Sequence, residues 1–355
     1  MSATPLNENV PEGGHRRTGT DARDVRQPVK MRTLVSAWGR LLRGYSPLLS
    51  IEITRECPLH CPGCYAYDDM HLGGGVTLRQ LRDRRGDALV EGVLDLVRRH
   101  RPVQVSFVGG EPLLRHKELS RILPIINGWG VYALVVTSAV VPFPVEWNAI
   151  PRVRVAVSID GLPREHDARR APATYDRILK NLKGRKADVS WVITNQMMDR
   201  PGYLDEYLAY WTDRPEIERV WLSIYTPQKG ERSAETLTPE SRHRLVTELP
   251  ALKWKYPALI LPHGAVEAFL NPPSDPTQCT FARVSVNYSA DLQARIEPCF
   301  FGGNPDCSQC GCAVSAGLHW MRAQRLAPGI RVGHLIDLSL AAGHHAPRKA
   351  PPLHG

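Results

Sequence analysis

Short β-rich runs separated by helical stretches follow one another from Leu48 onward, and this alternation constrains the fold more than any other feature. Six such runs lie at residues 48–54, 103–108, 131–136, 153–159, 189–193 and 219–224. Strands separated by helices pair in parallel through right-handed crossovers. Six units are too few to close an eight-stranded barrel, so the sequence predicts an α/β fold with a partial (β/α)6 TIM-type barrel.

The segments around this core differ from it in composition. The expected organisation is a disordered tail at 1–29, a basic amphipathic helix at 30–47, the barrel at 48–230, a small cysteine-rich region at 231–325 and a frayed C-terminal extension at 326–355. The amphipathic pattern of residues 30–43 has two interpretations: the helix packs across the end of the main domain, or it lies on an anionic membrane surface.

The composition and the first residues of the chain predict a cytoplasmic protein. It has 355 residues, of which 43% are hydrophobic and 23% charged, and its formal net charge is +9. We find no apolar run near the roughly 18 residues that span a bilayer, and the first residues lack the apolar core of a signal peptide. Basic residues are not interleaved with aromatic ones in a dense run, so no nucleic acid is expected as a partner. Clustered cysteines in a reducing compartment are more often metal or catalytic sites than disulfides.

Three cysteines follow the first predicted strand in the sequence ECPLHCPGCYAY, at Cys57, Cys61 and Cys64. This C-x3-C-x2-C loop is expected at the carboxyl mouth of the sheet, where active sites of α/β folds collect. A structural zinc site takes four protein ligands, and the nearest fourth candidate, His60, lies awkwardly between two of the cysteines. Three thiolates suit a [4Fe–4S] cluster whose fourth iron stays open for a substrate or cofactor.

This loop resembles the signature of the radical SAM superfamily. The sequence VGGEPLL, directly after the second predicted strand, resembles that family's GGE motif and contains Gly109, Gly110, Glu111 and Pro112. The resemblance implies that S-adenosylmethionine (SAM) chelates the open iron and that the GGEP backbone accepts hydrogen bonds from its amino group. It also implies a one-electron reductant of the flavodoxin or ferredoxin type, and a 5′-deoxyadenosyl radical that abstracts a substrate hydrogen.

Further cofactor contacts are expected from position in the same fold. The sequence VSIDGLPREHDARR, at the end of the fourth strand, resembles the family stretch that contacts the SAM ribose and carboxylate. The contacts expected there come from Ser158, Asp160 and one or both of Arg169 and Arg170. Guanidinium groups suit carboxylates, although these arginines could equally form the solvated start of a helix.

The chain also departs from the family pattern. The residue before the third cysteine is often aromatic and helps to seat adenine, but here it is Gly63, so Tyr65 is the substitute that we expect. After the third strand, Ser138 stands in a Thr-Ser-Ala sequence where many relatives carry an Asn-Gly pair. Thr194 and Asn195, at the end of the fifth strand, are expected at the same mouth.

A second set of cysteines lies near the C-terminus, at Cys279, Cys299, Cys307, Cys310 and Cys312. A β-hairpin is expected between the first two, with its turn at SAD (289–291). The arrangement resembles the twitch domain, a shortened SPASM domain that holds one auxiliary [4Fe–4S] cluster. The preferred ligands are the first four cysteines, which leaves Cys312 as a spare thiol, an alternative ligand or a residue near the substrate. A structural zinc site is the main alternative, because four thiolates also suit zinc.

Three functions remain open at this point. The leading hypothesis is a radical SAM enzyme acting on a small-molecule or lipid-like substrate, with a net oxidation if the auxiliary cluster accepts an electron. It is favoured because residues 1–47 are too few for a leader-peptide recognition domain. The alternatives are a radical SAM maturase of a peptide or protein, and a non-catalytic zinc or iron–sulfur binding protein. His166, Tyr225 and Cys312 are candidate hydrogen or proton partners of the substrate, although each such residue is more often structural.

Overall fold

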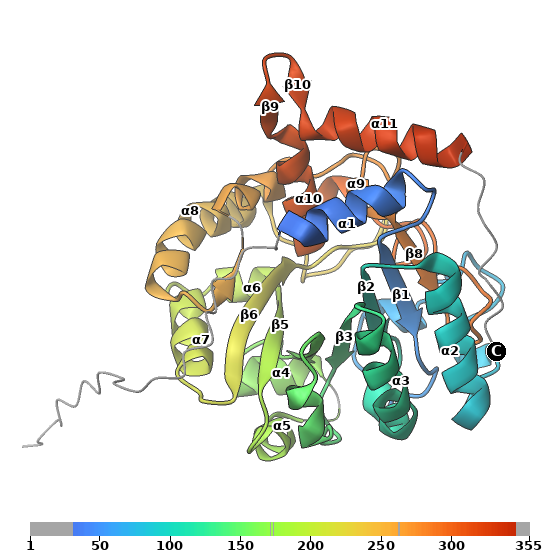
Figure 1. The fold of residues 1–355 in the computed structure, drawn as a ribbon. Coiled ribbons are helices and arrows are strands. Elements are labelled where there is room, and N and C mark those ends of the chain that lie inside the picture. The colour runs from blue at the N-terminus through green and yellow to red at the C-terminus, as the bar shows by residue number, and fades with distance from the viewer. Residues whose placement is uncertain (1–30, 171, 173, 262, 346–355) are drawn as a thin grey trace, which may run out of the picture.

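A single eight-stranded parallel sheet forms the centre of the molecule, with strand order β7-β6-β5-β4-β3-β2-β1-β8 (Figure 1). The computed structural model describes residues 31–345 except 171, 173 and 262; the expected tail at 1–29, Lys30 and residues 346–355 lie outside this range. The strands of the sheet are β1 (Leu48–Glu52), β2 (Gln104–Val108), β3 (Tyr132–Thr137), β4 (Val153–Ser158), β5 (Ala187–Ile193), β6 (Ile217–Ile224), β7 (Leu259–Ile260) and β8 (Ser285–Tyr288). Strands β1 to β6 are neighbours in chain order, which confirms the predicted partial barrel.

Helices between the strands cover the sheet (Figure 1). They are α2 (Gly86–His100), α3 (His116–Gly128), α4 (Pro163–Arg169), α5 (Tyr175–Leu182), α6 (Asn195–Met198), α7 (Tyr203–Thr212) and α8 (Pro239–Lys255). The apolar face expected for α2 is buried, since Leu89 and Val93 have no exposed surface and Leu96 and Val97 are 2% exposed. Burying such a stripe against the sheet is what stabilises a helix of this length.

The register of the sheet brings the ends of successive strands to one edge. Ile51 lies opposite Phe107, and Phe107 lies opposite Val135, so these buried side chains form one level of the core. One residue further along, Glu52 pairs with Val108. The loops that follow β1, β2 and β3 therefore leave the sheet side by side, as the carboxyl ends of parallel strands must.

The C-terminal half of the sheet differs from the expectation. The predicted hairpin strand at 282–288 is divided into a short helix, α9 (Thr280–Val284), and strand β8, which pairs in parallel with β1. The antiparallel hairpin shrinks to a bridge between Tyr288 and Arg295 with two flanking backbone hydrogen bonds. The edge of β1 offers β8 a full ladder of backbone partners, which a hairpin of this length does not.

The expected frayed extension after residue 325 is also wrong for the part that the structure describes. It contains strands β9 (Arg325–Ala327) and β10 (Ile330–Arg331), then helix α11 (Val332–His345), and it follows α10 (Ala313–Ala323). Asp337 links α11 to α9 and α10 by accepting hydrogen bonds from Arg283 and Arg322.

Helix α1 (Met31–Leu41) packs on α11, and both lie above the sheet with α10 (Figure 1). The indole nitrogen of Trp38 donates to the Ser339 hydroxyl, and the backbones of Gly44 and Gly343 are in direct contact. One face of helix α1 therefore packs against the C-terminal part of the chain, as the packing interpretation predicts. Among the described residues, no helix is long and apolar enough to span a bilayer.

Candidate active site

The loop after β1 carries the three N-terminal cysteines, and all three are half-buried. The pKa of the Cys57 thiol is raised to about 11, first by burial and then by the nearby Glu111, Cys61 and Cys64. The backbone amide of Leu59 donates to the same thiol and works against this rise. His60 is exposed. In the described part of the chain, no group of three or more His, Cys, Asp or Glu side chains is placed to hold a single metal ion.

A buried charge network fixes the start of this loop. Asp83 accepts hydrogen bonds from the Thr54 hydroxyl (2.8 Å) and from the Arg55 backbone amide (3.1 Å). Arg115, whose side chain is 7% exposed, binds both Asp83 and the carboxylate of Glu56, the latter at 2.7 Å. The residue directly before Cys57 is thereby held from two sides. A loop held in this way presents its thiols in one arrangement, as a binding site requires.

The GGE sequence after β2 lies directly against this loop. A side chain on Gly109 would meet Glu52, and a Cβ on Gly110 would lie 2.3 Å from the Glu56 carbonyl oxygen. Both glycines have a positive φ, at 73° and 51°. The backbone amide of Glu111 donates to the Glu56 carbonyl at 2.7 Å. Only glycine permits so close an approach in this conformation, so the two loops form one surface.

The Glu111 side chain is buried and turns toward β3. Its carboxylate accepts hydrogen bonds from the amide of Leu113, from the Thr137 hydroxyl, and from both the amide and the hydroxyl of Ser138. Pro112 begins the short 3₁₀ helix that follows. Ser138, which stands where many relatives carry an Asn-Gly pair, thus directs both its amide and its hydroxyl to Glu111. The carboxylate thus joins the loops after β2 and β3.

Asp160, after β4, forms the charged centre of the opposite side of the mouth. Arg169 and Arg170 both donate to its Oδ2 atom, Arg170 at 2.8 Å. Burial alone would raise the pKa of Asp160, but the two guanidinium groups prevail and hold it at about 2. The two arginines were predicted to bind the SAM carboxylate, and in the structure they bind the carboxylate of Asp160. Arg170 also interacts electrostatically with Cys61, which connects this group to the cysteine loop.

The second oxygen of Asp160, Oδ1, is buried and has no hydrogen-bond partner among the described residues. Buried carboxylate oxygens normally accept a hydrogen bond, so this atom fits a donor from a bound molecule. His166 shapes the same turn. Its Nδ1 accepts from the Asp160 amide at 3.2 Å and its Nε2 contacts the Thr174 hydroxyl at 3.0 Å. Burial lowers the pKa of His166 to about 4, so it is a neutral structural residue.

The remaining predicted residues lie around the same edge of the sheet. Ser158 is half-buried at the end of β4, and Thr194 is buried after β5. The Asn195 side chain accepts from the Thr238 amide at 3.2 Å and so binds the segment before α8. The Tyr225 hydroxyl lies 3.6 Å from where a Gly63 Cβ would be and donates to Glu231 at 2.6 Å.

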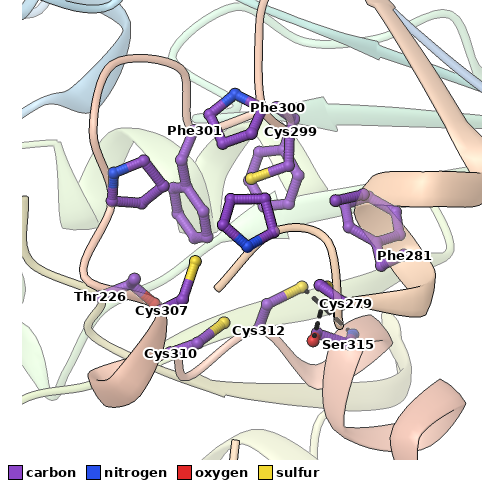
Figure 2. A pocket seen from close by; sticks show the side chains of 14 residues that line it. Thr226, Cys279, Phe281, Cys299, Phe300, Phe301, Cys307, Cys310, Cys312 and Ser315 are labelled. Carbon is purple, nitrogen blue, oxygen red and sulfur yellow. Dashed lines mark hydrogen bonds between the residues drawn. The ribbon is translucent and has the colours of Figure 1, made fainter. Parts of the chain in front are cut away.

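The five C-terminal cysteines line one pocket, together with Phe281, Phe300 and Phe301 (Figure 2). Burial and the neighbouring thiols raise the pKa of Cys299 to about 12 and that of Cys307 to about 11. Cys279 and Cys312 both lie against Ser315: the Cys279 sulfur is 3.3 Å from its hydroxyl, and the Cys312 sulfur caps α10 by accepting from its amide at 3.5 Å. The C-terminal region thus folds its five cysteines into a thiol-rich pocket.

Sequence reasoning missed the residues that join the two cysteine sets. The Tyr65 ring, expected to seat adenine, packs edge-on against Phe300 and Phe301, with centroid distances of 5.9 Å and 5.5 Å. Beside it lie two fully buried polar residues, Glu52 and His71, in contact at 2.8 Å. A signal for Glu52 was present, because a carboxylate inside the apolar strand sequence LLSIEIT needs a partner. Nothing in the sequence around His71 indicated that it was the partner.

Comparison with known families supports the geometry. Residues 51–210 match the family model described as the radical SAM superfamily. The chain contains a radical SAM domain. The matched range begins at the end of β1 and runs through β5 to most of α7, and it therefore includes the first cysteine loop, the GGE sequence and Asp160. Proteins of this superfamily bind a [4Fe–4S] cluster and SAM, so these two of the expected cofactors are confirmed at the level of the family.

Among curated proteins, the chain is similar to the PqqA peptide cyclase of Xanthomonas campestris pv. campestris and to that of Xanthomonas oryzae pv. oryzae. Both are 32% identical over 96 residues. The match covers 26% of this chain and 23% of either cyclase.

Among solved structures, the fold is similar to SuiB from Streptococcus suis bound to the precursor peptide SuiA. The TM-score is 0.55 at 14% identity, over 76% of this chain and 63% of SuiB. It is also similar to anSMEcpe with bound AdoMet and the Cp18Cys peptide, with a TM-score of 0.52 at 14% identity, over 85% of this chain and 81% of that one. At these identities the likeness concerns the fold.

Proposed function

We propose that this radical SAM enzyme modifies a peptide or protein substrate. The observation that carries the proposal is the placement of the five-cysteine pocket directly against the SAM-domain cysteine loop, through the contacts of Tyr65 with Phe300 and Phe301. The peptide substrate class is supported by the cyclase relatives, whose name identifies a peptide, and by two similar folds solved with peptides. The sequence alone placed a small-molecule or lipid-like substrate first, and these comparisons favour its alternative.

The residues present suit the cofactors of the family. Cys57, Cys61 and Cys64 would hold the cluster and leave one iron open, and the backbone at Gly109 and Gly110 offers a side-chain-free approach to a ligand. The unpaired oxygen of Asp160 would accept a hydrogen bond from the SAM hydroxyl or amino groups. When bound, the cluster supplies the one electron that cleaves SAM and generates a 5′-deoxyadenosyl radical.

The protein groups around this site orient and shield the reactants. Glu111 fixes the GGE loop to the end of β3, and Arg115 fixes the start of the cysteine loop to the segment before α2 through Glu56 and Asp83. Arg169 is bound to Asp160 and also to Glu235, at 2.6 Å and 2.9 Å, so the far side of the mouth is rigid as well. Rigid donors and acceptors around a reactive radical limit its side reactions with solvent.

In the C-terminal pocket, we propose that Cys279, Cys299, Cys307 and Cys310 hold an auxiliary [4Fe–4S] cluster. Cys312 is the odd residue because its sulfur already caps helix α10. The backbone amides of Phe301 and Cys312 donate to the sulfurs of Cys299 and Cys310. Such hydrogen bonds stabilise thiolate ligands and tune cluster potentials. A zinc ion at these four thiols is the alternative that metal analysis would reveal.

The direct test supplies the anaerobically reconstituted enzyme with dithionite, SAM and a deuterated peptide encoded next to its gene. The proposal predicts deuterium in 5′-deoxyadenosine and a mass change in the peptide. A loaded enzyme that makes 5′-deoxyadenosine but leaves every such peptide unchanged would contradict the peptide assignment. A loaded protein that makes no 5′-deoxyadenosine would instead favour the non-catalytic binding protein.

A membrane contact through α1 stays a separate proposal. Leu34, Val35, Trp38 and Leu42 keep exposed apolar surface, with Val35 at 60%. Liposome flotation of the full chain against a V35D/L42D variant tests it, on anionic and neutral vesicles. Equal flotation of both proteins on anionic vesicles would remove the proposal.

A further inference from the structure

A hydrogen-bonded network of buried polar side chains lies between the two cysteine sets, and the proposed function gives it no role. It consists of Glu52 at the end of β1, His71 in the loop after the first cysteines, and Ser289 just after β8; Glu52 is 1% exposed and the other two have no exposed surface. Glu52 Oε1 lies 2.8 Å from His71 Nε2, and the Ser289 hydroxyl donates to Glu52 Oε2. His71 Nδ1 lies 2.9 Å from the carbonyl oxygen of Phe301.

The partners of His71 determine where protons lie. A carbonyl oxygen only accepts, so the hydrogen bond to Phe301 requires a proton on Nδ1. The other nitrogen faces a carboxyl group, and a proton lies between them whether the imidazole or the carboxyl carries it. Each polar side-chain atom of Glu52, His71 and Ser289 therefore has a hydrogen-bond partner. A buried network that is satisfied in this way is rigid.

His71 also contacts the C-terminal cysteine segment through its backbone. Its carbonyl oxygen accepts from the amide of Gly303 at 3.1 Å. A Cβ on Gly302, whose φ is 66°, would lie 2.1 Å from the same oxygen. These glycines follow Cys299 closely in the sequence. His71 thus contacts this segment through both its ring and its backbone, and its ring lies 5.7 Å from that of Tyr65, measured between centroids.

We propose that His71, anchored by Glu52, is a positioning residue that seats the Cys299–Gly303 segment against the SAM-domain loop. Its Nδ1–H holds the segment, and its Nε2 edge anchors the ring to β1. The C-terminal metal site then depends on a residue that precedes it by more than two hundred positions. This inference rests on the proposed function only in assuming that the C-terminal thiols bind a cluster.

Two amide variants separate the two edges of the ring. In H71N, the side-chain amide reproduces the Nδ1–H donor to Phe301; in H71Q, it reproduces the Nε2–H donor to Glu52 instead. E52Q is the matched control, because its amide still pairs with His71 and Ser289 while Nδ1–H remains on the ring. All three are made in the full chain with C57A, C61A and C64A, so that the iron measured comes from the C-terminal site.

The first readout is iron release to a chelator after anaerobic reconstitution. Residues behind a metal ligand typically change metal affinity about 10- to 100-fold, so H71Q is expected to lose iron roughly tenfold faster than its parent. E52Q, which keeps both edges of the ring paired, is expected to stay within about twofold of the parent. H71N, which keeps the donor to Phe301 but loses the anchor to Glu52, is expected to lie between E52Q and H71Q. Equal release from H71Q and the parent, or equal acceleration in all three variants, would overturn the proposal.

The second readout is amide hydrogen exchange over residues 299–303, which needs no cluster. Exchange there is expected to accelerate in H71Q and not in E52Q, while exchange in the β3 and β4 core stays unchanged. If the parent binds no iron but H71Q alone loosens this segment, the auxiliary cluster fails and the seating role stands. Unchanged exchange in H71Q overturns the seating role whatever metal the site holds.

Discussion

The two cysteine sets of this molecule are built in opposite ways. The first occupies eight residues of one loop, is half-buried, and depends on side chains from neighbouring loops such as Asp83 and Arg115 to fix it. The second draws five thiols from residues 279–312, with Cys279 and Cys312 buried beside Ser315. A compact loop leaves room for an external ligand on its open side. A pocket lined by five thiols and three phenylalanine rings is suited to enclosing a bound group, so the comparison agrees with the proposal of chemistry at the first site and an enclosed cluster at the second.

The largest effect is expected from replacing one thiol in each set. C57S should reduce 5′-deoxyadenosine formation to the level of the protein-free control, because the cluster that delivers the electron loses a ligand. C310S should keep SAM cleavage while losing peptide modification. Chromatography of dithionite-reduced reactions measures both products. SAM cleavage that survives in C57S would contradict this account. So would a loss of SAM cleavage in C310S while its first cluster stays intact.

Next in size is the contact between the first cysteine loop and the GGE sequence. G110A places a Cβ 2.3 Å from one carbonyl oxygen and 2.6 Å from another, at a φ of 51°, and should lower the free energy of unfolding by about 3 kcal/mol. G128A is the matched control, because a Cβ there meets nothing within 4 Å. Chemical denaturation compares the two. A G110A protein as stable as G128A would show that the loops are not in this contact.

Asp160 should give the first site a stability that depends on pH. Its folded pKa of about 2 lies below the unfolded value of 3.8, so its contribution is full above the unfolded pKa and is lost as the pH falls toward 2. The shift corresponds to about 2 kcal/mol. D160N leaves two guanidinium groups without their carboxylate and should be less stable at pH 7, with a gap to wild type that narrows on acidification.

Denaturation curves at several values between pH 5 and pH 2 measure this gap. Wild-type and D160N stabilities that run parallel through that interval would mean that Asp160 is not held by Arg169 and Arg170.

The smallest effect is expected at the rim of the first loop. Arg85 pairs with Glu56, but its side chain is 62% exposed, so R85A should change stability by no more than about 0.5 kcal/mol. Arg115 binds the same carboxylate and is 7% exposed, so R115A should cost several times more. Thermal unfolding of the two variants orders them. Equal losses would show that exposure does not distinguish these pairs.

The sequence was sufficient for the parts of the molecule that depend on local pattern. Strands β1 to β6 and helix α2 follow from apolar periodicity, and the first cysteine loop follows from its position after β1. The GGE glycines were predicted from the resemblance to a family motif, and the structure supplies the backbone reason for them. Such features involve residues close together in the chain.

The parts that could not be predicted depend on distant partners. Strand β8 pairs with β1 across more than two hundred residues, which no local pattern indicates. Tyr65 turns toward Phe300 and Phe301 because the C-terminal segment lies there. Arg169 and Arg170 were expected to bind an external carboxylate, and the fold supplies Asp160 first. Helix α11 has a weak periodic pattern and is ordered by Asp337 and by its contact with α1.

The most direct test of two different metal sites is electron paramagnetic resonance of the reduced protein, with and without SAM, alongside iron analysis. The account predicts about eight irons in wild type and about four in the C57A/C61A/C64A variant. It predicts that SAM changes the wild-type signal and leaves that of the variant unchanged. A tetrahedral zinc ion at the first three cysteines would contradict this account. A wild-type signal that SAM does not change would contradict it as well.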